Sequence, residues 1–156
     1  MTPPSNPSSI YLDSNALIGV LEAHDGHEHV VQALELARQR KLDLYVSTLS
    51  YVEVRGWGNA DPYPPQRDKA ALALLDSPSL VSVEFSRGVG LKAREIAYTY
   101  RLKTPDAIHV ASAIHAGAEV LFTRDGQMRG RGRIEGVLIC EPYEIGEPTI
   151  FGSNQN

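Results

Sequence analysis

The chain has 156 residues, which is enough for one domain to bury a core without disulfides or a structural metal. Its formal net charge is −4 at pH 7, which argues against a broad electrostatic clamp on nucleic acid, so any such contact must be local. Cys140 is the only cysteine, which excludes an intramolecular disulfide and favours a reducing, cytoplasmic compartment. No apolar stretch approaches the roughly 20 residues that span a bilayer, so we expect a soluble protein that makes no membrane contact.

The two ends of the chain differ from its middle in composition. Residues 1–8 are rich in proline and serine and residues 151–156 are mostly polar, so both predict loose tails, the first of them disordered. Residues 9–150 show no linker and no repeat between these tails. We therefore expect a single domain over 9–150.

Short apolar runs alternate with helical patterns along this domain. The apolar runs predict strands at residues 10–12, 44–46, 80–85, 119–123 and 137–140. Apolar residues at helical spacing predict helices that begin near residue 16 and continue at about 30–42, 49–57, 67–75, 90–101 and 104–115. Such alternation is typical of an α/β fold in which helices cover both faces of a mainly parallel sheet.

Two acidic residues follow predicted strands directly. Asp13 ends the first apolar run, and Asp125 comes just after the run at 119–123. The carboxyl ends of parallel strands meet at one edge of the sheet, where ligands of such sheets bind. Each aspartate could also do no more than cap the turn that follows it.

Two further acids lie on predicted helices. Asp106 is in the first turn of an apolar helix, where an acid also stabilises the helix dipole without any catalytic meaning. Glu53 falls on an arc that we expect to face inward, where a bare carboxylate needs a partner, a proton or a metal. Its neighbours on that arc would be Leu49, Val52, Gly56 and Trp57.

Taken together, the four acids predict a metal site. Oxygen-rich clusters are what Mg²⁺ and Mn²⁺ prefer, and like charges held close together need a cation. The four candidate ligands are Asp13, Glu53, Asp106 and Asp125.

The segments around these acids resemble the successive motifs of PIN-domain nucleases. Their order and spread are similar to those of the small toxin ribonucleases of VapBC-type toxin-antitoxin pairs, and the likeness runs from about Ser9 to Glu144. The matching segments are Tyr11-Leu12-Asp13-Ser14-Asn15, Leu49-Ser50-Tyr51-Val52-Glu53, Thr104-Pro105-Asp106-Ala107-Ile108-His109-Val110-Ala111 and Thr123-Arg124-Asp125.

This resemblance implies a three-layer α/β/α sandwich of the Rossmann-like kind and a Mg²⁺- or Mn²⁺-dependent endoribonuclease. It assigns catalysis and metal binding to the four acids, with Asn15 and Thr123 as polar support. It also implies a cognate antitoxin partner and a homodimer. For the chemistry we expect in-line attack on RNA by metal-activated water, leaving a 5′-phosphate and a 3′-hydroxyl.

The basic and histidine residues near these motifs allow more than one interpretation. Four arginines crowd around the last acidic motif, and they either hold RNA phosphates or form a solvated Gly-Arg loop. These are Arg124, Arg129, Arg131 and Arg133. His109 and His115, on the apolar helix, are interpreted as hydrogen-bonded packing residues outside the site.

Two other functions remain open at this point. A PIN-like module that binds RNA or protein without cutting would keep the fold but lack metal-dependent cleavage. A signalling receiver domain also gathers acids and Mg²⁺, but it uses a lysine at a late strand end, and no lysine follows Lys103 in this chain.

Overall fold

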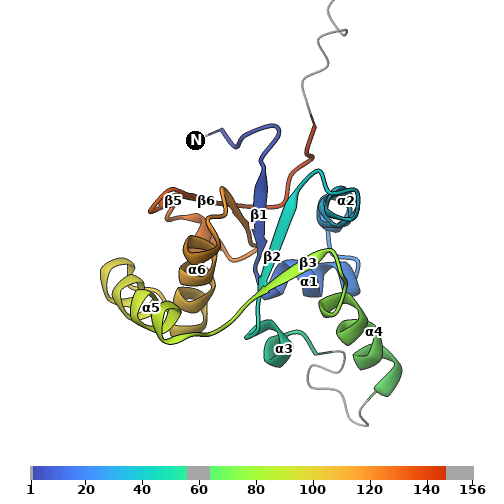
Figure 1. Cartoon of the computed structure of the whole chain (residues 1–156), viewed down its shortest axis with the longest axis horizontal. Coiled ribbons are helices and arrows are strands. Elements are labelled where there is room, and N and C mark those ends of the chain that lie inside the picture. Colours follow the sequence, from blue (N-terminus) through green and yellow to red (C-terminus); the bar gives the residue numbers. More distant parts are fainter. Residues whose placement is uncertain (1, 56–63, 147–156) are drawn as a thin grey trace, which may run out of the picture.

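The computed structural model describes residues 2–55 and 64–146. A central sheet of six strands runs through the described part in the order β3-β2-β1-β4-β6-β5 (Figure 1). Every pairing is parallel except that of β5 with β6, which is antiparallel. The strands are β1 (Ser9–Leu12), β2 (Asp43–Ser47), β3 (Leu80–Val83), β4 (Val120–Phe122), β5 (Arg133–Ile134) and β6 (Val137–Cys140).

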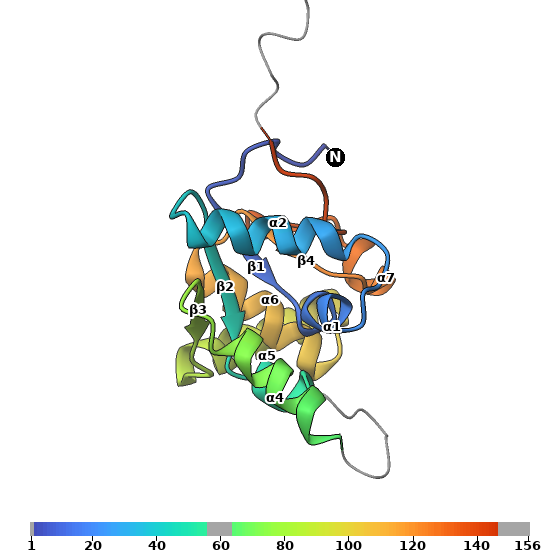
Figure 2. The same ribbon diagram turned by 90° about the vertical axis from the view of Figure 1, so that its right-hand side faces the viewer.

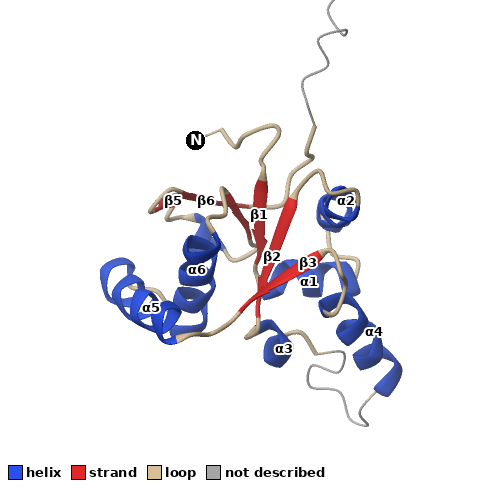
Figure 3. Cartoon of the chain, in the orientation of Figure 1, coloured by secondary structure: helices blue, strands red, loops and turns tan. Residues whose placement is uncertain are grey.

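Helices cover both faces of the sheet. Helices α1, α2 and α4 lie on one face, and α5 and α6 lie on the other (Figures 1 and 2). Figure 3 shows the sheet as the middle of three layers. The predicted α/β/α sandwich with a mainly parallel sheet is confirmed. The helices are α1 (Ser14–Leu21), α2 (His27–Arg38), α3 (Ser50–Glu53), α4 (Pro65–Leu75), α5 (Arg87–Tyr100), α6 (Thr104–Ala116) and α7 (Gly126–Arg129).

Each face of the sheet has its own hydrophobic core. Ile10 and Leu12 of β1 pack among residues of α1, α2 and α4, whereas Tyr11 packs among residues of α5 and α6. Successive side chains of a strand point to opposite faces, so β1 is buried on both sides and reads as a continuous apolar run. The same period of two directs Asp13, the next residue beyond β1, toward the side of the sheet that holds Tyr11.

Three local features differ from the sequence-based expectations. Helix α3 has only four residues, so the inward arc expected around Glu53 does not form: Val52 is 66% exposed, and Gly56 and Trp57 lie outside the described residues. Helix α2 begins at His27, one residue after Gly26, which has a left-handed backbone conformation. The Gly- and Arg-rich segment, which shows no periodicity in sequence, contains the short helix α7 and the strand β5.

The segment that precedes β1 lies against the end of the described chain. Residues 2–8 contain no helix or strand, but the Pro4 carbonyl accepts a hydrogen bond from the Tyr143 hydroxyl at 2.7 Å. The Ser5 carbonyl accepts another from the Gly146 amide at 3.0 Å. Residues 151–156, predicted to be a loose tail, lie outside the described part, within which no helix is long and apolar enough to cross a membrane.

Glycine plays opposite roles at the two ends of the α5–α6 pair, which gives a test of this part of the fold. Gly117 ends α6 at φ +71°, so Gly117→Ala should lower the free energy of unfolding by about 1 kcal/mol. Gly90 lies inside α5, and an added Cβ would meet Phe85 at an ordinary 3.7 Å. Gly90→Ala should therefore raise the free energy of unfolding by about 0.5–1 kcal/mol. Urea unfolding measures both changes, and shifts of the same sign would contradict the assigned helix end.

Candidate active site

Asp13 lies at the carboxyl end of β1 and caps the first turn of α1. One carboxylate oxygen, Oδ1, accepts the Ser14 amide at 2.8 Å, and the other, Oδ2, accepts the Thr123 hydroxyl at 2.7 Å. The residue is only 4% exposed. Burial raises the pKa of Asp13, although the nearby His109 charge and these hydrogen bonds oppose the shift. The carboxylate is therefore held firmly in a place where its charge is unfavourable.

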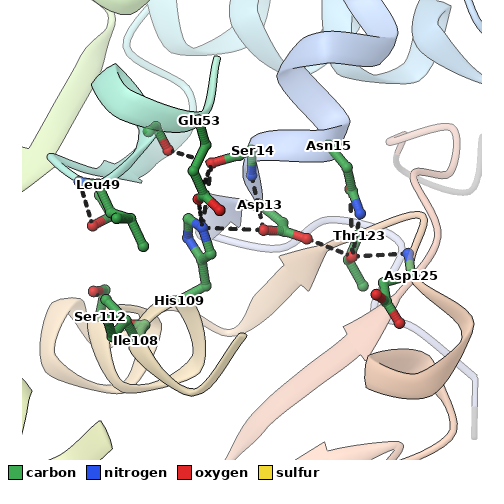
Figure 4. Close-up of polar contacts among 12 residues, drawn as sticks. Asp13, Ser14, Asn15, Leu49, Glu53, Ile108, His109, Ser112, Thr123 and Asp125 are labelled. Atoms are coloured by element: carbon green, nitrogen blue, oxygen red, sulfur yellow. Dashed lines mark hydrogen bonds and ion pairs between the residues drawn. The ribbon is translucent and has the colours of Figure 1, made fainter. Parts of the chain in front are cut away.

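Glu53 reaches the same place from α3, which follows the neighbouring strand β2. Its Oε1 accepts the Ser14 hydroxyl at 2.9 Å and lies 2.5 Å from Nε2 of His109 (Figure 4). Burial would raise the pKa of Glu53, but the hydrogen bond and charge of His109, with the Ser14 hydroxyl, leave it lowered. Glu53 is thus an ionised partner of His109.

Thr123 joins Asp13 to the polar residues that the sequence places around it. Its hydroxyl donates a hydrogen bond to Asp13. It accepts one from the side-chain amide of Asn15 at 3.2 Å and one from the backbone amide of Asp125 at 3.0 Å. The side-chain oxygen of Asn15, Oδ1, in turn accepts a hydrogen bond from the backbone amide of Arg124 at 2.9 Å. The structure therefore brings Asn15 and Thr123 together beside Asp13, at the ends of β1 and β4.

The remaining two acids come from α7 and α6. Asp125 caps α7, because its Oδ1 accepts the amides of Gln127 at 2.7 Å and Met128 at 3.1 Å. Asp106 lies in the first turn of α6. Burial raises the pKa of Asp106, and the negative charges of Asp125 and Asp13 raise it further. Asp106 therefore lies within reach of the charges of both other aspartates.

These residues fit a divalent cation in their chemistry. Carboxylate oxygens are the ligands that Mg²⁺ and Mn²⁺ prefer, and a cation relieves the repulsion that raises the pKa of Asp106. Within residues 2–55 and 64–146, however, no group of three or more His, Cys, Asp or Glu side chains is already arranged to hold an ion. An ion held by three or more of these acids would therefore require some of the side chains to move from their present positions.

The four arginines of the last motif do not form one cluster. The Arg124 guanidinium contacts the His24 ring, and Arg124 lines a cavity of about 370 Å³ together with the acidic residues Asp25, Glu28 and Glu141. Arg129 forms an ion pair with Glu141 at 2.6 Å. Arg133 donates to the Gly136 carbonyl at 2.9 Å, and Arg131 is exposed.

Sequence reasoning missed the residues that connect the acids. His109 is buried within the site rather than outside it. The hydroxyl groups of Ser14 and Ser50 are hydrogen-bonded to each other at 2.9 Å beside Glu53. A signal was present, since His109 follows Asp106 by three positions and so lies on the same side of α6. Helical spacing alone does not reveal that Glu53, 56 positions earlier, lies against it.

The fold and the site define an α/β/α domain with acids gathered at the carboxyl ends of its central strands, the place where open parallel sheets bind ligands. The sequence also matches the family model of the PIN domain over residues 10–133. The chain belongs to the PIN domain family.

Solved structures share this fold over most of the chain. VapBC2 from Rickettsia felis, bound to a promoter DNA fragment, is 16% identical with a TM-score of 0.64, and the match covers 85% of this chain and 98% of that one. A toxin-antitoxin complex from Klebsiella pneumoniae is 25% identical with a TM-score of 0.62, covering 87% and 99%. VapC20 of Mycobacterium tuberculosis, a sarcin-ricin loop cleaving toxin, is 16% identical with a TM-score of 0.59, covering 81% and 97%. A comparison with curated proteins gives no match.

The burial of Asp13 predicts a pH-dependent gain in stability when its charge is removed. Because the pKa of Asp13 is raised in the folded state, the wild type loses stability as the pH rises through that pKa, whereas Asp13→Asn does not. In chelator at pH 8 the variant should melt a few degrees higher, since about 1 kcal/mol corresponds to about 2–4 °C in a domain of this size. The difference should shrink toward pH 4.

Thermal melts followed by circular dichroism at both pH values measure this effect. Asp43→Asn, at the exposed start of β2, is the matched control and should show no such pH dependence. If the wild type melts at a higher temperature than Asp13→Asn at pH 8, the conclusion that burial of this charge is unfavourable is contradicted.

Proposed function

We propose that this protein is a divalent-metal-dependent endoribonuclease and the toxin of a toxin-antitoxin pair. The observation that carries the proposal is that Asp13 and Glu53, from separate elements, both lie against His109 in a member of the PIN domain family. The resemblance in fold to toxins of VapBC systems, one of them a sarcin-ricin loop cleaving toxin, supports it further. Family membership also favours a nuclease over a receiver domain.

Asp13, Glu53, Asp106 and Asp125 are the residues we assign to a Mg²⁺ or Mn²⁺ ion. When bound, such an ion polarises the phosphoryl oxygen and lowers the pKa of water, so that a protein nucleophile is not needed. The chain itself orients the acids: Thr123 fixes one oxygen of Asp13, and Asn15 fixes Thr123. The Ser14 hydroxyl donates to Glu53 and is hydrogen-bonded to the Ser50 hydroxyl, which fits a supporting role better than nucleophilic attack.

We propose that the four arginines beside the last acidic motif bind the phosphates of the RNA backbone. Guanidinium groups bind phosphates well, and in a chain with a net charge of −4 the contact must be local, so each arginine would hold a separate phosphate along the strand. Arg131 is already exposed, whereas Arg124 and Arg129 would exchange their contacts with His24 and Glu141 for phosphate.

We also propose an antitoxin partner, because several structures of this fold are toxin-antitoxin complexes. Such a partner would neutralise the toxin by laying an apolar, charge-bearing segment over the acids. Its contacts would compete with RNA for the same edge of the sheet.

Metal-dependent cleavage is the direct test of the enzymatic proposal. Wild-type protein should cleave structured RNA in Mg²⁺ or Mn²⁺ and lose this activity in chelator. Asp13→Asn and Asp106→Asn should each lower cleavage by at least about 100-fold, because each removes charge from the ion's ligand set. Gel analysis of labelled RNA, with circular dichroism to confirm folding, measures both effects.

The control is Asp43→Asn, which makes the same chemical change at the opposite end of β2 and should keep full activity. Cleavage that ignores chelator, or a folded Asp13→Asn protein with full activity, would refute the assignment. RNA binding without any cleavage would instead support the silent PIN-like module.

We propose that a second copy of the chain covers the groove between α5 and α6. This groove has a volume of about 690 Å³ and is mainly apolar, and two of its lining residues, Phe85 and Leu91, are 54% and 51% exposed. Large exposed apolar side chains grouped in one place mark interaction surfaces.

Light scattering after gel filtration tests this surface. The wild type should be a dimer, and Leu91→Glu should be a monomer, because a charge would be buried in the apolar interface. Leu72→Glu makes the same change at an exposed leucine on the other side of the sheet and should remain a dimer. A Leu91→Glu dimer, or a monomeric wild type, would contradict the proposal.

A further inference from the structure

His109 occupies an unusual position for a buried histidine. It is 1% exposed, and its Nε2 faces three oxygen atoms that come from two other elements of the fold. These are Glu53 Oε1 at 2.5 Å, Ser14 Oγ at 3.2 Å and Asp13 Oδ1 at 3.4 Å. Figure 4 shows dashed lines that join the ring to both Asp13 and Glu53. A single side chain of α6 therefore connects the acid at the end of β1 with the acid on α3.

The far side of the ring is also held. Nδ1 lies 2.7 Å from the Tyr11 hydroxyl, and the two rings meet edge to face at 5.9 Å between centroids. Tyr11 is fully buried in the core beneath α5 and α6, and it belongs to the same strand that ends at Asp13. With both ring nitrogens occupied, neither rotation nor a flip of the imidazole is possible without losing a buried hydrogen bond.

The chemistry of the ring settles the direction of the Glu53 contact. In the imidazolium, and equally in the neutral tautomer that accepts the Tyr11 proton at Nδ1, Nε2 carries a hydrogen and donates to Glu53. Ser14 donates to the same oxygen, so Oε1 holds both bonds. Within the described residues Oε2 of Glu53 takes no hydrogen bond, which leaves it available to a ligand.

We propose that His109, braced by Tyr11, is a positioning residue that keeps Glu53 turned toward Asp13 so that the two acids can share one cation. This inference rests on the proposed function. Glu53 needs such support because α3 has only four residues and the carboxylate is half-buried beside another negative charge. Without a donor from α6, repulsion by Asp13 and the pull of solvent would both turn the Glu53 side chain outward.

Mn²⁺ affinity of the whole chain tests the proposal without any measurement of cleavage. Removing the outer hydrogen-bond partner of a ligand commonly costs about 10- to 100-fold in metal affinity, which is the loss we expect for His109→Leu. Tyr11→Phe removes only the bracing hydroxyl and should weaken binding by about 2- to 10-fold. His109→Gln keeps an N–H donor near the position of Nε2 and should stay within about 3-fold of the wild type. Electron paramagnetic resonance of free Mn²⁺ gives the affinities.

A second readout separates positioning from a general loss of structure. In metal-free protein, the ¹⁵N chemical shifts of the His109 ring report which nitrogen carries hydrogen, and Tyr11→Phe should change the Nδ1 shift. His115→Leu, at an exposed histidine of the same helix, is the matched control and should alter neither the Mn²⁺ affinity nor the His109 shifts. If His109→Leu does not fold, the comparison of Tyr11→Phe and His109→Gln with wild type decides the question.

The possible failures are distinguishable. If folded His109→Leu binds Mn²⁺ as tightly as the wild type, the positioning role is overturned and the proposed nuclease stays intact. If His109→Leu does not fold, unchanged Mn²⁺ affinity in Tyr11→Phe has the same meaning. A wild type that binds no Mn²⁺ would contradict the proposed function itself, and the positioning role with it. Weakened binding in His109→Leu with recovery in His109→Gln would establish the inference.

Discussion

The site depends on one constraint, which is that the Asp13 carboxylate is buried at the end of the central strand. A carboxylate in that position must be hydrogen-bonded, and the surrounding residues serve that need. The amide of Ser14 and the hydroxyl of Thr123 each take one oxygen, and His109 supplies a nearby positive charge. Because these partners come from α1, the end of β4 and α6, the charge at Asp13 fixes how three elements meet.

The resulting chain of hydrogen bonds also explains why the acids can be brought together at all. Tyr11 holds His109, His109 holds Glu53, and Thr123 holds Asp13 while being held by Asn15. Three of these anchoring residues, Tyr11, His109 and Thr123, are buried, and Asn15 is half-buried. Buried polar groups that are fully partnered make a site rigid, whereas a partly satisfied network would be a liability.

Much of the fold is predictable from the sequence, and the reasons are physical. The fully buried strands of a parallel sheet appear as continuous apolar runs, and Gly117 marks the end of α6 because its φ of +71° disfavours other residues. The predicted inward arc around Glu53 was wrong, because a four-residue helix is too short to bury a face. Glu53 lies beside the other acids through a tertiary hydrogen bond to His109, and periodicity carries no information about contacts between distant segments.

The charge around the site is unevenly compensated, and this asymmetry indicates where a cation gains most. On the side of Glu53, the positive charge of His109 lowers the pKa of the glutamate below its usual range despite burial. On the side of Asp106, burial and the charges of Asp125 and Asp13 raise the pKa. The chain neutralises one half of the acidic group with its own imidazole and leaves the other half repelling. Under the proposed function, a cation beside Asp106 would offset negative charge that burial and the neighbouring acids make unfavourable, whereas Glu53 already has His109 as its partner.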